Sequence, residues 1–263
     1  KIISAAGALA TDKLVQQSVP EWSIFSPTQK VTMKSGISHM YAYIGIDGDT
    51  SELNLRSSNL WALPSVNISE DCKAYYEDPF HMDEKEQLLM FLGFPSAKDP
   101  NFHKKYPGKS TCVIITEAKS EWFEQFNCKD AASGKRKSVE YSEYKDKFKN
   151  ILLNGLYKHY PQLNGLVSYC EIASPLSNEY YLRRTASYGL THDPSRYTAK
   201  GSLRPQSRIK NLYLTGQDIA TSGFAGAMMG GLLTAHAVLG YGLWDILCCN
   251  ANLVTDMEKI TKK

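Results

Sequence analysis

The residues with the clearest chemical potential lie in one stretch, residues 211–240, NLYLTGQDIATSGFAGAMMGGLLTAHAVLG. An apolar run, a glycine-rich turn and a small-residue segment, in that order, predict a strand, a turn and a helix. The free N–H groups and the positive dipole at such a helix start suit an anionic group. Gly216, Gly223 and Gly226 would let a ligand approach the backbone without side-chain obstruction. Asp218 would then accept hydrogen bonds from ligand hydroxyls, since a carboxylate repels a phosphate.

Two adjacent glycines in the expected helix, Gly230 and Gly231, support two interpretations equally. Interior glycine costs a helix about 1 kcal/mol relative to alanine, so a pair of glycines needs a reason. Close packing against a neighbour is one reason, and close approach of a cofactor is another. The usual dinucleotide motif G-x-G-x-x-G does not decide between them. Gly240-Tyr241-Gly242 could begin such a motif, but Asp245 occupies the position of its last glycine. No strand is expected before these residues.

A second glycine turn lies at the start of the chain. Lys1–Ala5 predicts a buried strand that runs directly into Ala6 and Gly7. Backbone can pass close to a ligand at such a turn, although a plain turn is the favoured interpretation from these residues alone. Thr11-Asp12 is expected to cap a short helix, Lys13–Ser18.

The periodicity of apolar residues predicts the strands and helices that would position these turns. The section from about Phe25 to Arg204 alternates strand and helix patterns and predicts a mixed sheet with helices on one face, an α+β layer. The expected strands are Ser38–Ile46, Ser110–Glu117 and Leu166–Ala173, and the expected helices are Asp83–Phe91 and Val139–Tyr160. Residues 20–35 are expected to be irregular. Residues 174–178 and 188–193 are expected to be loops, with a pocket lining as the alternative.

Size, charge and composition narrow the class of protein. The 263 residues could form one large domain or two small ones, and an apolar fraction of 43% supports a real core. A net charge of +3 gives no reason to expect a nucleic-acid partner. The six cysteines form no C-x-x-C pair, so we expect no metal site. The apolar stretch 243–249, with Lys262 and Lys263 beyond it, is expected to dock on the domain, with peripheral membrane contact as the alternative.

Three segments resemble one family of flavoproteins. Residues 211–233, NLYLTGQDIATSGFAGAMMGGLL, resemble the C-terminal flavin-binding segment of the retinol saturase family, within the wider group of carotenoid isomerases and phytoene desaturases. Residues 1–11, KIISAAGALAT, resemble the last flavin-domain strand of that family. SPLSNEYYL at 174–182 and ASYGLTHD at 186–193 resemble its serine-proline stretch and its Tyr-Gly to His-Asp segment. Residues 27–160 match only by order and length.

The resemblance implies an α/β with α+β architecture, as the C-terminal part of a two-domain FAD-dependent fold of the amine-oxidase and phytoene-desaturase type. An incomplete Rossmann flavin domain would be joined to a mixed-sheet substrate domain. Residues 1–25 and 206–246 would be flavin-binding segments, residues 26–205 the substrate domain, and residues 247–263 a helical tail. The G-x-G-x-x-G turn of the adenine side would lie upstream of Lys1.

The resemblance also implies a reaction, the saturation of one double bond in a conjugated polyene alcohol of the retinoid class. FAD would be the cofactor, with NAD or NADP as an alternative electron source, while the protein orients the apolar substrate. The residues expected to hold FAD are Gly216, Asp218, Gly223, Ala225, Gly226, Ala6 and Gly7. His192, Tyr188 and Tyr181 are candidate proton donors by their chemistry, although a lone histidine is more often structural.

The family further implies a location at the endoplasmic reticulum membrane, with the targeting segment expected upstream of this chain. The expected partner is an apolar polyene, and the oligomeric state is left open. Two alternatives remain at this point. One is a carotenoid isomerase or desaturase-like flavoenzyme, and the other is a non-catalytic, lipid-binding remnant of the same fold.

Overall fold

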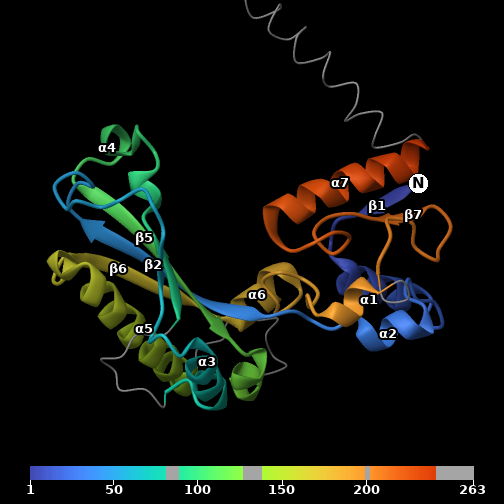
Figure 1. The fold of residues 1–263 in the computed structure, drawn as a ribbon, viewed down its shortest axis with the longest axis horizontal. Coiled ribbons are helices and arrows are strands. Elements are labelled where there is room, and N and C mark those ends of the chain that lie inside the picture. Colours follow the sequence, from blue (N-terminus) through green and yellow to red (C-terminus); the bar gives the residue numbers. More distant parts are fainter. Residues whose placement is uncertain (81–88, 127–137, 199–201, 241–263) are drawn as a thin grey trace, which may run out of the picture. The chain divides into compact units, whose positions relative to one another are not determined.

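The computed structural model describes residues 1–80, 89–126, 138–198 and 202–240, and it divides the chain into two compact units (Figure 1). The first unit joins the two ends of the chain, Lys1–Gly36 and Tyr188–Lys263. The second unit is the central section, Ile37–Ser187. This section is shorter at both ends than the 26–205 assigned from sequence to a substrate domain. The functional labels of these segments stay predictions, and the expected tail 247–263 lies outside the described residues.

The first unit is built on a small parallel sheet. Strand β1 (Ile2–Ser4) pairs in parallel with β7 (Leu212–Leu214), and the helices are α1 (Ala8–Ser18), α2 (Pro27–Thr32) and α7 (Gly223–Leu239). Its core contains Ala8, Ile24, Phe25, Met33, Leu190, Leu203, Leu214 and Ile219. The expected strand and helix of the 211–240 stretch are therefore confirmed. The expectation of a buried first strand is wrong, because Ile2 and Ile3 are 67% and 52% exposed.

Two helices of the first unit differ from the sequence-based expectation. Residues 20–35 were expected to be irregular, but α2 forms there, with a capping box between Ser26 and Gln29 and proline at its first turn. Helix α1 begins at Ala8 instead of Lys13, so Thr11 and Asp12 lie inside the helix and do not cap it. A partner distant in sequence supplies the cap of α1, as described below.

The second unit contains one five-stranded sheet. Its strands are β2 (Ser38–Asp47), β3 (Leu60–Ala62), β4 (Met90–Gly93), β5 (Lys109–Ala118) and β6 (Val167–Ala173), in the order β3-β4-β5-β2-β6. Every pairing in this sheet is antiparallel, so the expected mixed sheet is wrong. Its long strands alternate buried and more exposed residues, which is typical of an antiparallel sheet with one uncovered face. The chain as a whole is α/β with α+β, with parallel and antiparallel sheets.

Among the residues that the structure describes, helices cover one face of this sheet and none covers the other. The long helix α5 (Val139–His159) buries Phe148, Ile151, Leu152 and Leu156 against the alternate residues of β2 and β5 that point inward (Figure 1). The shorter helices are α3 (Ile68–Glu77), α4 (Phe102–Lys105) and α6 (Pro175–Leu182), with 3-10 turns at Pro95–Ala97, Ser120–Phe126 and Pro161–Leu163.

Two sequence-based expectations in this unit are corrected. Residues 174–178 were expected to form a loop, but they begin α6, because Ser174 and Ser177 form a capping box around Pro175. The expected helix Asp83–Phe91 falls largely outside the described residues. Its last residues belong to β4, where Met90 and Phe91 pair with β5.

Candidate functional site

The two glycine turns leave the same edge of the parallel sheet. Ser4 pairs with Leu214 at the carboxyl ends of β1 and β7, and the Thr215 N–H donates to the Ser4 carbonyl at 3.0 Å. Ala6-Gly7 and the turn at 215–223 therefore follow two adjacent parallel strands. In open α/β sheets, ligands bind outside the carboxyl ends of the strands. We call this region, residues 5–8 and 215–226, the glycine-turn edge; it includes the first turn of α7.

Asp218 serves an internal role at this edge. Its side chain is 4% exposed, and its two oxygens accept from the N–H of Ala8 at 2.7 Å and of Leu190 at 3.1 Å. The first bond caps α1, where a negative charge also interacts favourably with the helix dipole. A Cβ at Gly189, whose φ is +78°, would lie 2.2 Å from the same carboxylate. Asp218 thus ties three segments together, and a contact with ligand hydroxyls stays a prediction.

Gly226 and Gly230 are explained by close backbone packing. A Cβ at Gly226 would lie 1.5 Å from the carbonyl oxygen of Thr221, and one at Gly230 would lie 2.1 Å from that of Gly216. The Thr234 hydroxyl donates to the Leu214 carbonyl at 2.8 Å and strengthens the same contact between α7 and the strand. Packing accounts for these two glycines without a ligand.

Gly216 and Gly223 require glycine for a different reason. Their φ angles are +95° and +82°, a region that L side chains rarely adopt, and a Cβ at either position would meet no atom within 4 Å. The Gly223 N–H donates to the Gln217 side chain at 2.8 Å, while the Ser222 side chain caps no N–H of α7. Ala6 and Ala225 are exposed. The backbone of this edge is therefore open to solvent beside Gly216 and Gly223.

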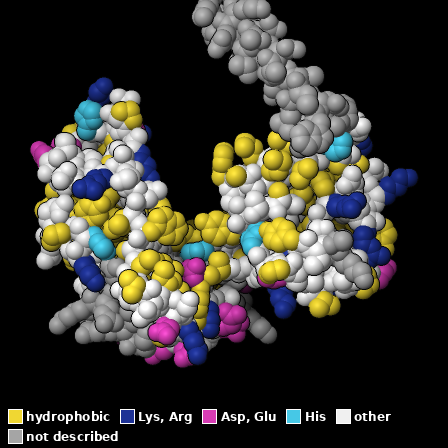
Figure 2. Space-filling model, in the orientation of Figure 1, with side chains coloured by type: hydrophobic (Ala, Val, Ile, Leu, Met, Phe, Trp, Pro, Cys, Tyr) yellow, Lys and Arg dark blue, Asp and Glu magenta, His cyan; other side chains and the backbone are white. Residues whose placement is uncertain are grey.

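Helix α7 presents an apolar surface to solvent. Phe224 is 84% exposed, Met228 59% and Met229 43%, and Figure 2 shows hydrophobic side chains gathered over this helix. An exposed apolar patch of this kind is typical of a surface that contacts a ligand or another part of a protein. Sequence reasoning missed this exposure because α7 is apolar almost all round, which predicts burial.

The candidate proton donors are divided between the units. His192 and Tyr188 lie in the first unit, on the loop that Asp218 holds at Leu190, and Tyr188 is 44% exposed. Tyr181 lies on α6 in the second unit, where it is 78% exposed and packs edge-on against Tyr180. Burial and the charge of Arg196 lower the pKa of His192 from its usual value, with Asp218 opposing them.

The uncovered face of the second unit's sheet is rich in aromatic side chains. Tyr41 and Tyr43 stack with ring centroids 6.2 Å apart, and Trp61 meets Phe91 edge-on at 5.2 Å. Tyr169 lies on the same face, beside Gly45. Trp61, Tyr43 and Tyr169 are 70%, 45% and 56% exposed. We call these five aromatic residues the open sheet face. Exposed rings on adjacent strands make this face more apolar than an ordinary solvated sheet face.

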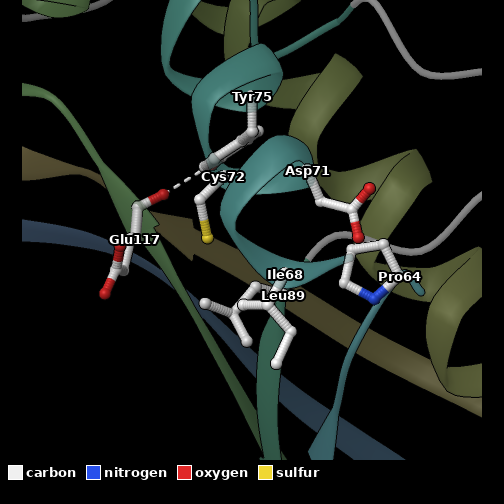
Figure 3. Close-up of a pocket in the computed structure, with 7 residues that line it drawn as sticks. All are labelled: Pro64, Ile68, Asp71, Cys72, Tyr75, Leu89 and Glu117. Carbon is white, nitrogen blue, oxygen red and sulfur yellow. Dashed lines mark hydrogen bonds between the residues drawn. The ribbon is translucent and has the colours of Figure 1, made fainter. Parts of the chain in front are cut away.

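A small pocket lies elsewhere in the second unit, between α3 and the sheet (Figure 3). It is lined by Pro64, Ile68, Asp71, Cys72, Tyr75, Leu89 and Glu117. The Tyr75 hydroxyl donates to the Glu117 carbonyl at 2.5 Å, and the Tyr76 hydroxyl donates to the Glu117 carboxylate. Burial raises the pKa of both tyrosines, so they stay protonated and act as hydrogen-bond donors. These bonds fasten α3 to β5, and their role is structural.

Comparisons with known proteins give evidence that is independent of the site's geometry. No family model matches the chain. The chain is 36% identical over 265 residues to the all-trans-retinol 13,14-reductase of Rattus norvegicus, which covers 98% of this chain and 42% of that protein. The human protein of the same name is 36% identical over 220 residues, 82% of this chain and 36% of its own length. A Danio rerio protein named inactive all-trans-retinol 13,14-reductase is 30% identical over 268 residues, 100% of this chain and 42% of its own length.

These matches make the chain a relative of a family of oxidoreductases. The family is that of the all-trans-retinol 13,14-reductases, so the resemblance seen in the sequence is confirmed. The chain spans about two fifths of the length of the curated relatives it matches.

Proposed function

We propose that this chain is part of an FAD-dependent oxidoreductase that saturates one double bond of a retinoid, of the type that converts all-trans-retinol to 13,14-dihydroretinol. The observation that supports this most strongly is the similarity to the rat reductase across 98% of the chain. The glycine-turn edge and the open sheet face supply two surfaces that such a reaction needs, one for a cofactor and one for an apolar substrate.

The cofactor would be held at the glycine-turn edge. Gly216 and Gly223, with open space beside their α-carbons, and the exposed Ala6 and Ala225 are the residues we assign to direct contact. Gly7 starts α1 at the same edge. FAD, when bound, supplies the hydride chemistry that no side chain can provide. The contribution of this chain is to hold and orient the cofactor through its backbone.

Two of the expected cofactor-binding residues would act from behind this surface. Asp218 orients the turn through its bonds to Ala8 and Leu190, and Gly226 lets α7 approach Thr221. Both are needed for the shape of the edge, and neither needs to contact FAD itself.

The substrate would lie against aromatic side chains. The open sheet face offers rings of Tyr43, Trp61 and Tyr169 to solvent, and an apolar polyene buried against them would lose contact with water. The stretch 243–249, expected to dock on the domain, lies outside the described residues, and peripheral contact with the membrane from which a retinoid is drawn stays the alternative for it. We further propose the endoplasmic reticulum membrane as the location and NAD or NADP as the electron source. Among the described residues, no helix combines the length and apolarity required to cross a bilayer.

A second candidate is a non-catalytic protein of the same fold, and one observation favours it. The Danio rerio relative that matches the whole of this chain is named an inactive reductase. A carotenoid isomerase or desaturase-like flavoenzyme is the alternative within flavin chemistry.

One experiment separates these candidates. The chain, expressed with its native upstream sequence, is purified and its visible spectrum recorded, and retinol is then supplied with a reductant. We expect a flavin spectrum and a product heavier than retinol by two hydrogen atoms. A flavin spectrum with a product of unchanged mass indicates an isomerase. A folded protein without flavin contradicts both enzymatic readings and supports the non-catalytic one.

A further inference from the structure

A buried arginine anchors the loop that carries His192. Arg196 is 2% exposed and lies in the 3-10 turn Pro194–Tyr197. Its guanidinium donates to the carbonyl of Thr191 at 3.3 Å and to the carbonyl of Asp218. Arginine is almost never buried unless its donors are matched by acceptors. These bonds therefore fasten the loop to the glycine-turn edge.

The same guanidinium contacts the ring of His192. Nη1 of Arg196 lies 3.2 Å from Nδ1 of His192, and the Tyr197 hydroxyl also meets Nδ1. A guanidinium has donors and no acceptor, so this contact is favourable only when Nδ1 presents its lone pair. A proton on Nδ1 would set two donors against each other.

We propose that Arg196 is a positioning residue that holds His192 as the neutral imidazole with its proton on Nε2, so that the exposed ring offers one hydrogen-bond donor to a neutral oxygen of a ligand. The tautomer follows from Nδ1 alone, because a neutral imidazole carries a single ring proton. The ligand oxygen would be the hydroxyl of the polyene alcohol. That part rests on the proposed function, whereas the tautomer does not.

The surrounding charges act in the same direction. Partial burial and the charge of Arg196 lower the pKa of His192 below its usual 6.5, so the ring is neutral at pH 7. Asp218 opposes this, but its carboxylate oxygens already accept from the N–H groups of Ala8 and Leu190. An imidazolium would also place a second cation beside Arg196. His192 is therefore a hydrogen-bond donor at neutral pH and not the acid that protonates a double bond.

Nitrogen NMR reads the tautomer directly. The 263-residue chain is labelled with ¹⁵N-histidine, and two-bond ¹H–¹⁵N correlations are recorded across a pH titration. The chain has six histidines, and the signals of His192 are those lost in His192→Gln. We expect an unprotonated Nδ1, a protonated Nε2 and a titration midpoint below 6.5. A proton on Nδ1, or a midpoint at or above 6.5, overturns the proposal.

Two variants test whether Arg196 is the cause. Arg196→Met should leave a mixture of tautomers and move the midpoint of His192 upward, whereas Tyr197→Phe should keep the proton on Nε2. Arg208→Met is the matched control, since Arg208 also donates to a backbone carbonyl of the first unit, that of Phe25 at 2.9 Å. An Arg196→Met chain that is folded and keeps the unmodified tautomer and midpoint contradicts the proposal. If that variant does not fold, the spectrum of the unmodified chain still decides the tautomer.

Retinol kinetics of the longer protein test the ligand contact. Gln retains an N–H donor and Phe does not, so His192→Phe should raise the KM for retinol several-fold more than His192→Gln, with kcat keeping its pH profile. Equal KM values in the two variants would contradict the donor role. A complete lack of retinol reduction by the unmodified protein counts against the proposed function alone, because the tautomer is read without turnover.

Discussion

The glycine-turn edge of the first unit is shaped by contacts between backbone segments, whereas the sheet of the second unit is shaped by packing of large side chains. At the edge, backbone touches backbone, and one carboxylate, that of Asp218, joins segments that lie far apart in the chain. In the sheet, side chains fill a core between α5 and the strands. The comparison shows that the shape of the edge depends on missing side chains, whereas the shape of the sheet and its covering helix depends on large ones.

The difference predicts distinct responses to substitution, and the largest is expected in the core of the second unit. Phe148 is fully buried among other aromatic rings. Phe148→Ala should lower the free energy of unfolding of this unit by about 4 kcal/mol, because it removes a buried ring and leaves a cavity. Hydrogen exchange read by mass spectrometry would locate the loss. Val66→Ala, at a site 94% exposed, should change stability by less than about 0.5 kcal/mol. Equal losses in peptides of both units would mean that they do not unfold separately.

At the glycine-turn edge, adding a methyl group should lower the stability of the first unit, as removing a ring lowers that of the second. Gly226→Ala should destabilise the first unit by about 3 kcal/mol, because its Cβ would overlap the Thr221 carbonyl. Gly231→Ala is the matched control on the same helix. A Cβ at Gly231 meets nothing within 4 Å, so this change should stabilise the helix by up to about 1 kcal/mol. Chemical denaturation of the two variants checks the sign, and a Gly226→Ala chain as stable as Gly231→Ala would refute the packing.

Loss of the carboxylate clamp should have an intermediate effect. Asp218→Ala leaves the buried N–H groups of Ala8 and Leu190 without their acceptor, and we expect a loss of about 2 kcal/mol. Asp218→Asn keeps one acceptor oxygen and should lose less. Amide exchange at the start of α1 and at Leu190 should accelerate in Asp218→Ala. Unchanged exchange at both positions would show that Asp218 does not clamp them.

The smallest expected effect is a pH dependence of the second unit. Burial lowers the pKa of His39 from 6.5, with Glu117 opposing it. The folded state therefore binds a proton less readily than the unfolded chain, and stability should fall as the pH drops below 6.5. His39→Gln should flatten this dependence, which denaturation at a series of pH values would measure. A slope identical to that of the unmodified chain would exclude His39 as its source.

Sequence patterns predicted the three long strands β2, β5 and β6 and the long helix α5 well, because each is set by local periodicity. The alternation in 38–46 indicates which residues of β2 share a face, whereas 112–115 is a continuous apolar run, and only the structure shows which residues of β5 face the core. The start of α6 was also readable, since Ser174 and Pro175 form a helix-start signature that was taken for a loop. The antiparallel pairing of the sheet was harder to predict, because it depends on strands distant in sequence.

The site was less predictable than the fold. The hydrogen bond between Asp218 and Ala8 joins residues 210 positions apart, and no local sequence pattern predicts it. The same holds for the burial of Arg196, which was not among the candidate residues. The glycines were identified correctly as special, but only the structure separates those that pack, Gly226 and Gly230, from those with open space beside them.

We propose that the open part of the glycine-turn edge holds a flavin in the longer protein. Two exposed alanines on α7 allow a direct test that leaves the packed glycines untouched: Ala225 at the helix start, and Ala227 as the matched control. The measurement is the visible flavin absorbance per folded protein in Ala225→Leu and Ala227→Leu. We predict that Ala225→Leu loses the flavin while Ala227→Leu retains it. Full flavin content in a folded Ala225→Leu protein would contradict the claim.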